Sequence, residues 1–256
     1  RDLLMAEIRG ELEELKRNFA DPRRTTIVSA GFDDITIEDM IADEPMVITV
    51  SRGGYVKRTP LSLYRSQHRG GKGRLGMATK DDDDVEQLYV ATAHSTVLVF
   101  TESGKVHWLK VHQIPESAPT TRGKAIVNLL QIEGDERIAT TVAVREFDDR
   151  HFLVFATEQG VVKRTELSAY ANPRAGGIIA ISLDEGDRLL AARETDGKGD
   201  LMLATRNGIS IRFPEHQVRS MGRNTRGVRG IDLREGDVVV SLAPLGQEGE
   251  ILTVSE

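Results

Sequence analysis

Residues 51–58 (Ser-Arg-Gly-Gly-Tyr-Val-Lys-Arg) decide the fold, because the same eight-residue frame occurs three more times, at 101–108, 157–164 and 205–212. Each copy joins two runs rich in β-branched and apolar residues, as the turn of a β-hairpin does. The glycines of these turns are 50, 56 and 48 residues apart: Gly54, Gly104, Gly160 and Gly208. A glycine is expected there because the tight turns that match strand twist need positive φ.

A second landmark keeps the same period. The tripeptide Glu-Gly-Asp occurs at residues 133–135, 185–187 and 235–237. A period near 50 residues with several strands per unit is typical of propeller-like arrays, in which each blade packs against its neighbours. We therefore predict an all-β fold, a β-pinwheel or propeller-like array of about 50-residue, four-stranded blades. Four blades are complete and a fifth is begun, because residues 253–256 repeat the lead-in of the first hairpin.

A short α-helix is expected to precede the array. Apolar residues recur at three- and four-residue spacing through Leu4, Ile8, Leu12 and Leu15, with charged residues between them. Asp21-Pro22 ends this pattern, because the residue before proline is pushed out of helical geometry. We predict a helical tail of a longer element with its linker at 1–24, and a β-pinwheel domain at 25–256 that is incomplete at its C-terminus.

Composition excludes several classes of protein. The 256 residues hold no cysteine, which rules out disulfides, thiolate metal sites and cysteine nucleophiles and fits the cytoplasm. Aromatic residues make up only 5%, which is few for a platform that stacks single-stranded bases. No apolar run approaches the roughly 20 residues that cross a bilayer, so no membrane association is expected. The formal charge of −6 is an average over basic and acidic segments.

The basic residues occupy the same part of every repeat. Seven of them lie between residues 52 and 74 without an acid, and six arginines lie between 206 and 229 against Glu215 alone. Stacking the repeats about one axis would place them on one outer rim, and a curved positive stripe suits the backbone of double-stranded DNA. The alternative is an ordinary solvated face. The predicted rim residues are Lys57, Arg58, Arg65, Arg74, Arg122, Lys124, Lys163, Arg164, Arg174, Arg206, Arg212, Arg219, Arg223, Arg226 and Arg229.

A glycine-rich heptapeptide stands within the first repeat. Its residues are Gln67, His68, Arg69, Gly70, Gly71, Lys72 and Gly73. Three glycines in four positions let the backbone approach a surface closely and leave its N–H groups free for phosphate oxygens. The spacing is not that of a Walker loop. We predict a DNA-binding loop, and the alternative is a flexible surface loop without a ligand.

The heptapeptide resembles the GyrA box (Gln-Arg-Arg-Gly-Gly-Lys-Gly) in the C-terminal domains of DNA gyrase A subunits, which are type IIA topoisomerases. Six of the seven residues match, and His68 replaces an arginine. The resemblance extends over the whole chain. Residues 1–24 look like the helix that leaves the family's cleavage core, and residues 54–58 and 121–124 look like its blade signatures.

The resemblance implies a β-pinwheel that wraps duplex DNA on its outer rim, so that the ATP-hydrolysing enzyme introduces negative supercoils. It also implies a bacterial, nucleoid-associated protein whose partners are DNA, the rest of a dimeric gyrase A subunit and the gyrase B subunit in an A2B2 complex. ATP and Mg²⁺ are bound elsewhere in the holoenzyme, and this segment is expected to need no cofactor. The C-terminal domain of the topoisomerase IV A subunit is the alternative, although its box is degenerate or missing.

No catalytic constellation is predicted within the chain. The six histidines and the acidic run 81–84 lack metal-ligand spacing, and the four tyrosines lie in β repeats without a nucleophile's surroundings. Trp108 is expected to pack in or between blades. A protein-interaction propeller would share the period but scatter its basic residues, and a propeller enzyme would need acid, base or metal groups that recur toward the axis.

Overall fold

A computed structural model describes residues 2–21, 25, 38–64, 66–73, 75–79, 83–130, 132 and 136–246. The chain divides into two units, Arg1–Met40 and Ile41–Glu256. The first contains α1 (Asp2–Phe19), the predicted N-terminal helix, and the 3-10 turn η1 (Glu38–Met40). Along α1 the apolar side chains are exposed, among them Leu4, Leu12 and Phe19. No helix in the described ranges is long and apolar enough to cross a membrane.

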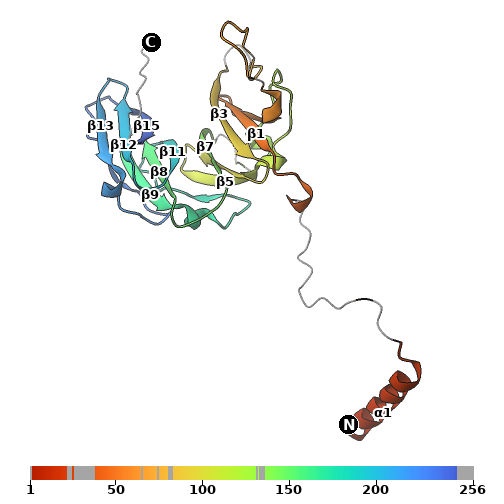
Figure 1. Ribbon diagram of the computed structural model, residues 1–256. Coiled ribbons are helices and arrows are strands. Elements are labelled where there is room, and N and C mark those ends of the chain that lie inside the picture. The colour runs from red at the N-terminus through yellow and green to blue at the C-terminus, as the bar shows by residue number, and fades with distance from the viewer. Residues whose placement is uncertain are drawn as a thin grey trace. The chain divides into compact units, whose positions relative to one another are not determined.

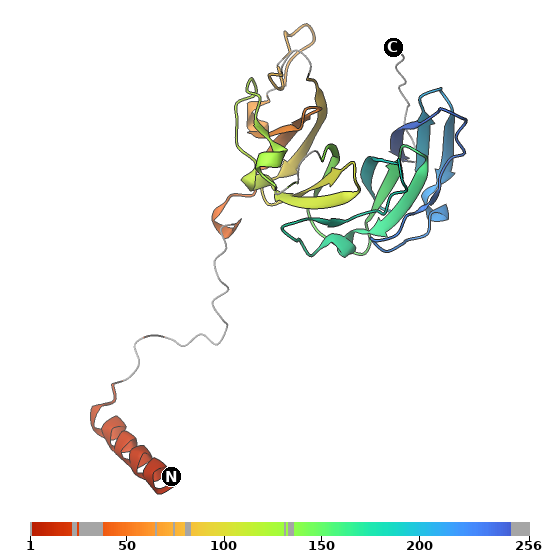
Figure 2. The same ribbon diagram turned by 180° about the vertical axis from the view of Figure 1, so that it is seen from behind.

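The second unit is the predicted array, in which four antiparallel sheets follow one another in an open arc (Figure 1). The first and fourth sheets stand at the two ends of the arc (Figure 2). Each repeat supplies three strands to its own sheet. In chain order these are β1 (Pro45–Ser51), β2 (Tyr55–Pro60) and β3 (Val85–Thr92); β4 (Thr96–Thr101), β5 (Lys105–Lys110) and β7 (Ile138–Val144); β8 (Phe152–Thr157), β9 (Val161–Glu166) and β11 (Leu189–Thr195); and β12 (Asp200–Thr205), β13 (Ser210–Pro214) and β15 (Val239–Leu245).

The fourth strand of each of the first three sheets comes from the next repeat. The short strand β6 (Lys124–Ala125) pairs with β2, β10 (Ile178–Ile179) pairs with β5, and β14 (Val228–Arg229) pairs with β9. We call these three the clasp strands. The resulting orders are β3-β1-β2-β6, β7-β4-β5-β10 and β11-β8-β9-β14, while the described part of the fourth sheet has the order β15-β12-β13. The fold class is therefore the predicted one, with the added finding that successive blades are interlocked.

Apolar side chains fill the space between successive blades. The central strands β1, β4 and β8 are covered on both faces, and every residue of β4 is buried. Along β12 buried and partly exposed residues alternate. Phe100 of β4 and Phe155 of β8 meet edge to face with ring centroids 5.4 Å apart, inside the cluster shared by the second and third blades. Trp108 packs against the same cluster, and its indole nitrogen donates to the Tyr170 carbonyl at 2.9 Å, so the predicted packing role is confirmed.

The two sequence landmarks meet at one end of the third and fourth blades, while the Glu-Gly-Asp of residues 133–135 lies outside the described residues. The turn glycines have φ of +76°, +83°, +82° and +82° in Gly54, Gly104, Gly160 and Gly208, as expected. The aspartate of the Glu-Gly-Asp turn accepts a hydrogen bond from the hairpin backbone: Asp187 Oδ1 lies 3.0 Å from the nitrogen of Gln159 and Asp237 Oδ1 lies 3.1 Å from that of Asn207. Asp83 does the same at 2.7 Å for Gly53. These aspartates therefore hold the hairpin turns.

The clasp requires a glycine immediately before β6. Gly123 has φ of +83°, and a Cβ atom there would overlap the carbonyl oxygen of Val56 in β2. Gly208 has nearly the same φ, +82°, but open space around its Cα. Gly208→Ala should therefore cost about 1–2 kcal/mol from the left-handed backbone alone. Gly123→Ala should cost clearly more, because it also displaces β6.

Chemical denaturation of the two variants and the parent chain measures this difference. Equal free energies of unfolding for Gly123→Ala and Gly208→Ala would show that the clasp contributes nothing beyond backbone strain.

Candidate nucleic-acid interface

The segment that leads into each clasp strand runs along the outer edge of the blades. The inner strands β7, β11 and β15 contact one another in series, which leaves the clasp strands on the outside. We call the lead-in segments the rim loops. They comprise residues 114–123, 171–177 and 218–227, which lead into β6, β10 and β14. We include residues 66–73, which stand at the equivalent place of the first repeat.

The glycine-rich heptapeptide forms the rim loop of the first repeat, and all seven of its residues are exposed. Gln67 closes the loop: its Oε1 accepts from the Gly73 nitrogen at 3.0 Å, and the Gly71 nitrogen donates to the His68 carbonyl at 3.0 Å. A Cβ atom on Gly71 would lie 2.8 Å from Gln67 Oε1, so glycine is required for this closure. The turn directs exposed backbone and the cations of Arg69 and Lys72 to solvent.

Two of the predicted rim residues are buried instead. Lys57 and Lys163 are both 0% exposed, so the expectation that they lie on the outer surface is wrong. They stand on β2 and β9, one strand inward from the clasp strands, and the next repeat's rim loop covers them. Lys57 Nζ donates to the carbonyls of Ala118 at 3.0 Å, Pro119 at 2.5 Å and Thr121 at 2.9 Å. Three ammonium hydrogens thus meet three acceptors.

The arginines beside these lysines are also largely covered. The side chain of Arg58 is 17% exposed; its Nε donates to the Ile114 carbonyl at 2.7 Å, and the guanidinium pairs with Glu116 at 3.5 Å. Arg164, 13% exposed, lies over the Phe152 ring at 4.6 Å and pairs with Glu215 at 3.8 Å. The adjacent lysine and arginine of the second strand therefore bind the next repeat and do not form the predicted exposed stripe.

The remaining predicted cations fall into two groups, those on the rim loops and clasp strands and those elsewhere in the fold. Those on the rim loops and clasp strands are Arg122, Lys124, Arg174, Arg219, Arg223, Arg226 and Arg229. Arg122 is half-buried with its guanidinium carbon 3.5 Å from the centroid of the Tyr55 ring, and Arg223 is half-buried as well. Lys124, Arg174 and Arg219 are exposed. The side chains of Arg226 and Arg229 are 62% and 77% exposed and pair with Asp184 and Asp232.

Two predicted residues lie away from the rim loops. Arg206 stands on the hairpin turn of the fourth blade, where its backbone nitrogen donates to the Val238 carbonyl. Arg212 lies on β13 and pairs with Asp200 of β12 at 2.6 Å. Arg65 and Arg74 lie outside the described residues. Of the predicted cations that the structure describes, the exposed ones on the rim loops and clasp strands form a narrower set than the sequence predicted, and Arg206 and Arg212 are exposed elsewhere.

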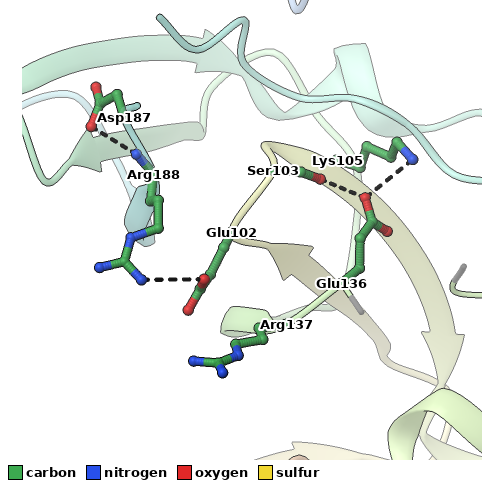
Figure 3. A pocket seen from close by; sticks show the side chains of 7 residues that line it. All are labelled: Glu102, Ser103, Lys105, Glu136, Arg137, Asp187 and Arg188. Carbon is green, nitrogen blue, oxygen red and sulfur yellow. Dashed lines mark hydrogen bonds and ion pairs between the residues drawn. The ribbon is translucent and has the colours of Figure 1, made fainter. Parts of the chain in front are cut away.

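The hairpin-turn end of the blades carries mixed charge in a pocket (Figure 3). Arg188 pairs with Glu158 at 2.9 Å and with Glu102 at 3.6 Å, joining the turns of the second and third blades. Lys105 Nζ and Ser103 Oγ both reach Glu136, at 3.1 and 2.5 Å. These charges satisfy one another. Within the described residues no group of three or more His, Asp or Glu side chains could hold a metal ion.

Burial sets the charge of the two lysines. It lowers the pKa of Lys57, and it lowers the pKa of Lys163 to about 7, with Arg223 adding to the effect. Lys163 Nζ has two acceptors, the carbonyls of Ala180 at 2.6 Å and of Arg223. A neutral amine has two N–H groups, which match these two acceptors.

A pH dependence of stability follows. The pKa of Lys163 is about 7 in the folded chain and near 10.5 in the unfolded one, so the unfolded chain binds more protons between these values. The free energy of unfolding gains from this group as pH rises through that window, by at most about 1.4 kcal/mol per pH unit. Denaturation from pH 7 to 10 should show this gain in the parent chain and in Lys198→Met, an exposed control. A Lys163→Met chain with the same pH slope as the parent would contradict it.

Comparison with known proteins agrees with this architecture. A family model described as DNA gyrase C-terminal domain, beta-propeller, matches residues 45–92, 95–145, 151–196 and 199–245, which are the four blades. The DNA gyrase A subunit of Staphylococcus epidermidis is 44% identical over 258 residues and that of Salmonella typhimurium is 45% identical over 255. Both alignments cover 100% of this chain and 29% of the relative, so the chain spans about three tenths of their length.

Solved structures show the same fold. The C-terminal domain of DNA topoisomerase IV superposes with a TM-score of 0.68 and 32% identity, over 81% of this chain and 63% of that one. A DNA gyrase A C-terminal domain superposes with a TM-score of 0.64 and 24% identity, over 78% and 65%. The four matched repeats and the two gyrase A relatives support one assignment: this chain belongs to the DNA gyrase C-terminal domain family of β-propellers.

Proposed function

We propose that this chain is the DNA-wrapping domain of a gyrase A subunit. It binds duplex DNA along its rim loops and bends it around the arc, and the complete ATP-dependent type II topoisomerase uses that bend to introduce negative supercoils. The chain itself contributes no bond-making step and needs no nucleotide or metal. Its partners in this proposal are DNA, the rest of a dimeric gyrase A subunit and the gyrase B subunit, in the bacterial cytoplasm.

The observation that carries the proposal is the distribution of exposed cations. Rim loops from all four repeats present at least one exposed or half-exposed basic residue, through Arg69, Arg122, Arg174 and Arg219. Contacts with phosphates need positive charge spaced along a path and no base-specific geometry. Loops at equivalent places in successive blades supply such a path along a curved edge.

The rim loops of the second and fourth repeats are also hydrogen-bonded to the residues that follow the preceding rim loop. The Ala78 nitrogen donates to the Thr121 carbonyl at 3.4 Å between the first and second repeats, and the Ser182 nitrogen donates to the Thr225 carbonyl at 3.1 Å between the third and fourth. Ser182 Oγ reaches the Asn224 carbonyl at 3.0 Å. A connected edge of this kind holds its charges at fixed spacing, which favours bending a stiff duplex over following it.

The glycine-rich rim loop gives the proposal its most specific support. Gly70 and Gly73 both have positive φ, and neither has an atom within 4 Å of an added Cβ position. A duplex backbone can therefore approach the main chain closely, with Arg69 and Lys72 beside it. The intact Gly-Gly-Lys-Gly sequence favours gyrase over topoisomerase IV, whose C-terminal domain shares the fold.

Removing the two cations of the loop tests the proposal. Arg69→Ala with Lys72→Ala should reduce supercoiling by the reconstituted enzyme at least tenfold and leave ATP turnover intact, because the loop positions DNA and takes no part in chemistry. The matched control is Arg145→Ala with Arg150→Ala. These arginines are 72% and 84% exposed and lie outside the rim loops, so the same charge is removed elsewhere.

Both variants are compared in supercoiling, in ATP hydrolysis and in DNA affinity against salt. The salt dependence of DNA binding should become shallower for the loop variant, by about 0.9 in log–log slope for each phosphate that is no longer neutralised. Equal supercoiling by the loop variant and the control would refute a wrapping role for the loop. Decatenation without supercoiling by the parent enzyme would assign the chain to the topoisomerase IV type.

A further inference from the structure

One position of the repeat faces the next repeat's rim loop in every blade that has a following repeat. It lies three residues after the turn glycine and is occupied by Lys57, His107, Lys163 and Ile211. The first three are buried at 0%, 3% and 0% exposure, while Ile211 stands at the end of the arc and is 37% exposed. The position is therefore a joint between successive blades.

The two lysine joints are built from backbone carbonyls alone. Lys57 holds three carbonyls of the 114–123 loop, and Lys163 joins the Ala180 carbonyl, just after β10, to the Arg223 carbonyl of the 218–227 loop. Carbonyls turned inward toward an amine leave the opposite side of the loop, with its side chains, facing outward. A buried lysine without an acidic partner is costly and rare, so its retention at two joints calls for a specific role.

The histidine joint lacks this bonding. Gly177 of the third rim loop packs on the His107 ring, where an added Cβ would lie 2.6 Å from Cε1. Both ring nitrogens of His107 are buried and have no hydrogen-bond partner among the described residues. The loop over His107 carries a single cation, Arg174. The loop over Lys163 carries three, Arg219, Arg223 and Arg226, whereas the loop over Lys57 carries one, Arg122.

From these hydrogen bonds between buried lysines and rim loops we propose that Lys57 and Lys163 are positioning residues for DNA binding, each fixing the cation-bearing rim loop of the following repeat without touching DNA. The proposal rests on the proposed wrapping function. Lys57 and Lys163 belong to the repeated basic pattern but are buried and cannot contact DNA. The proposal gives them a role in holding the loops that do. A loop released from its lysine keeps its charges but presents them at variable positions, so wrapping weakens although the net positive surface charge is unchanged.

The test uses the complete gyrase A subunit with Lys163→Met or Lys57→Met, because methionine keeps most of the length of the unbranched side chain and removes its donors. Amide exchange in the free protein reports each loop. Lys163→Met should speed exchange about tenfold at the Met221 and Thr225 amides, and Lys57→Met should do so at the Ser117 and Thr121 amides. Tenfold is expected because the lost bonds to each lysine should together cost the loop a net free energy about equal to that of one hydrogen bond. Each variant should leave the other's loop within twofold of the parent.

Wrapping is measured on the same proteins as the linking-number shift of a nicked plasmid sealed by ligase with the gyrase A subunit bound. Both methionine variants should lose at least half of the shift, and Lys198→Met, the same substitution at an exposed site, should keep it. Adding Arg226→Ala to Lys163→Met should lower the shift by less than it does in the parent, because a displaced loop no longer places that arginine.

The outcomes separate the two levels of the proposal. No linking-number shift with the parent protein would refute wrapping itself. A shift in the parent that both methionine variants retain would overturn the positioning role and leave wrapping intact. Faster exchange throughout all blades in either variant would also overturn it, since the lysine would then support the core as a whole. Full additivity of Arg226→Ala and Lys163→Met would do the same.

Discussion

The exchange of one short strand between successive repeats is the constraint on which the rest of the structure depends. Two-residue strands such as β6 complete the hydrogen bonding of the preceding blade at its outer edge. This pairing covers part of an edge that would otherwise be open, which folded sheets avoid. It also places the segment that leads into each strand on the outside of the array. The position of the rim loops is therefore a consequence of how the blades are joined.

The joint then determines what the basic residues do. A lysine on the second strand faces the rim loop of the next repeat, and it is buried against main-chain carbonyls in the first and third blades. Its neighbouring arginine pairs with an acid of the next repeat, Glu116 or Glu215. Near this joint, the basic residues that remain exposed or half-exposed to a ligand are those of the rim loop and the clasp strand. The same repeat motif thus contains a structural pair and a set of surface charges, separated by one strand.

Much of the fold could be predicted from the sequence because its strongest signals are local. The recurring turn glycine, as in Gly104, fixes the period, and the period fixes the class of architecture. The exchanged strands were missed because a two-residue strand has no periodicity to detect. The burial of Lys57 was missed for a related reason. Lysine is usually exposed, and the carbonyls that hold it lie 61 to 64 residues further along the chain.

The glycine-rich heptapeptide could be recognised from the sequence because its proposed function depends on residue types that are adjacent in the chain, glycines beside Arg69 and Lys72. The acidic turns were harder to interpret. Asp187 and Asp237 stand in a charged tripeptide whose glutamate and glycine are exposed, yet each aspartate is buried and accepts hydrogen bonds from a hairpin two strands away in sequence. Long-range backbone contacts of this kind distinguish a structural carboxylate from a solvated one, and no pattern in the local sequence records them.

The central claim is that one duplex lies along the rim loops in the order of the blades. Photo-crosslinking groups placed singly at Lys124, Arg174 and Arg219 of the gyrase A subunit test it most directly, with Glu185 on a hairpin turn as the reference position. The account predicts crosslinks from the three rim positions to successive segments of a single duplex, in blade order, and none from Glu185. Crosslinks in any other order, or from Glu185 in place of the rim, would contradict it.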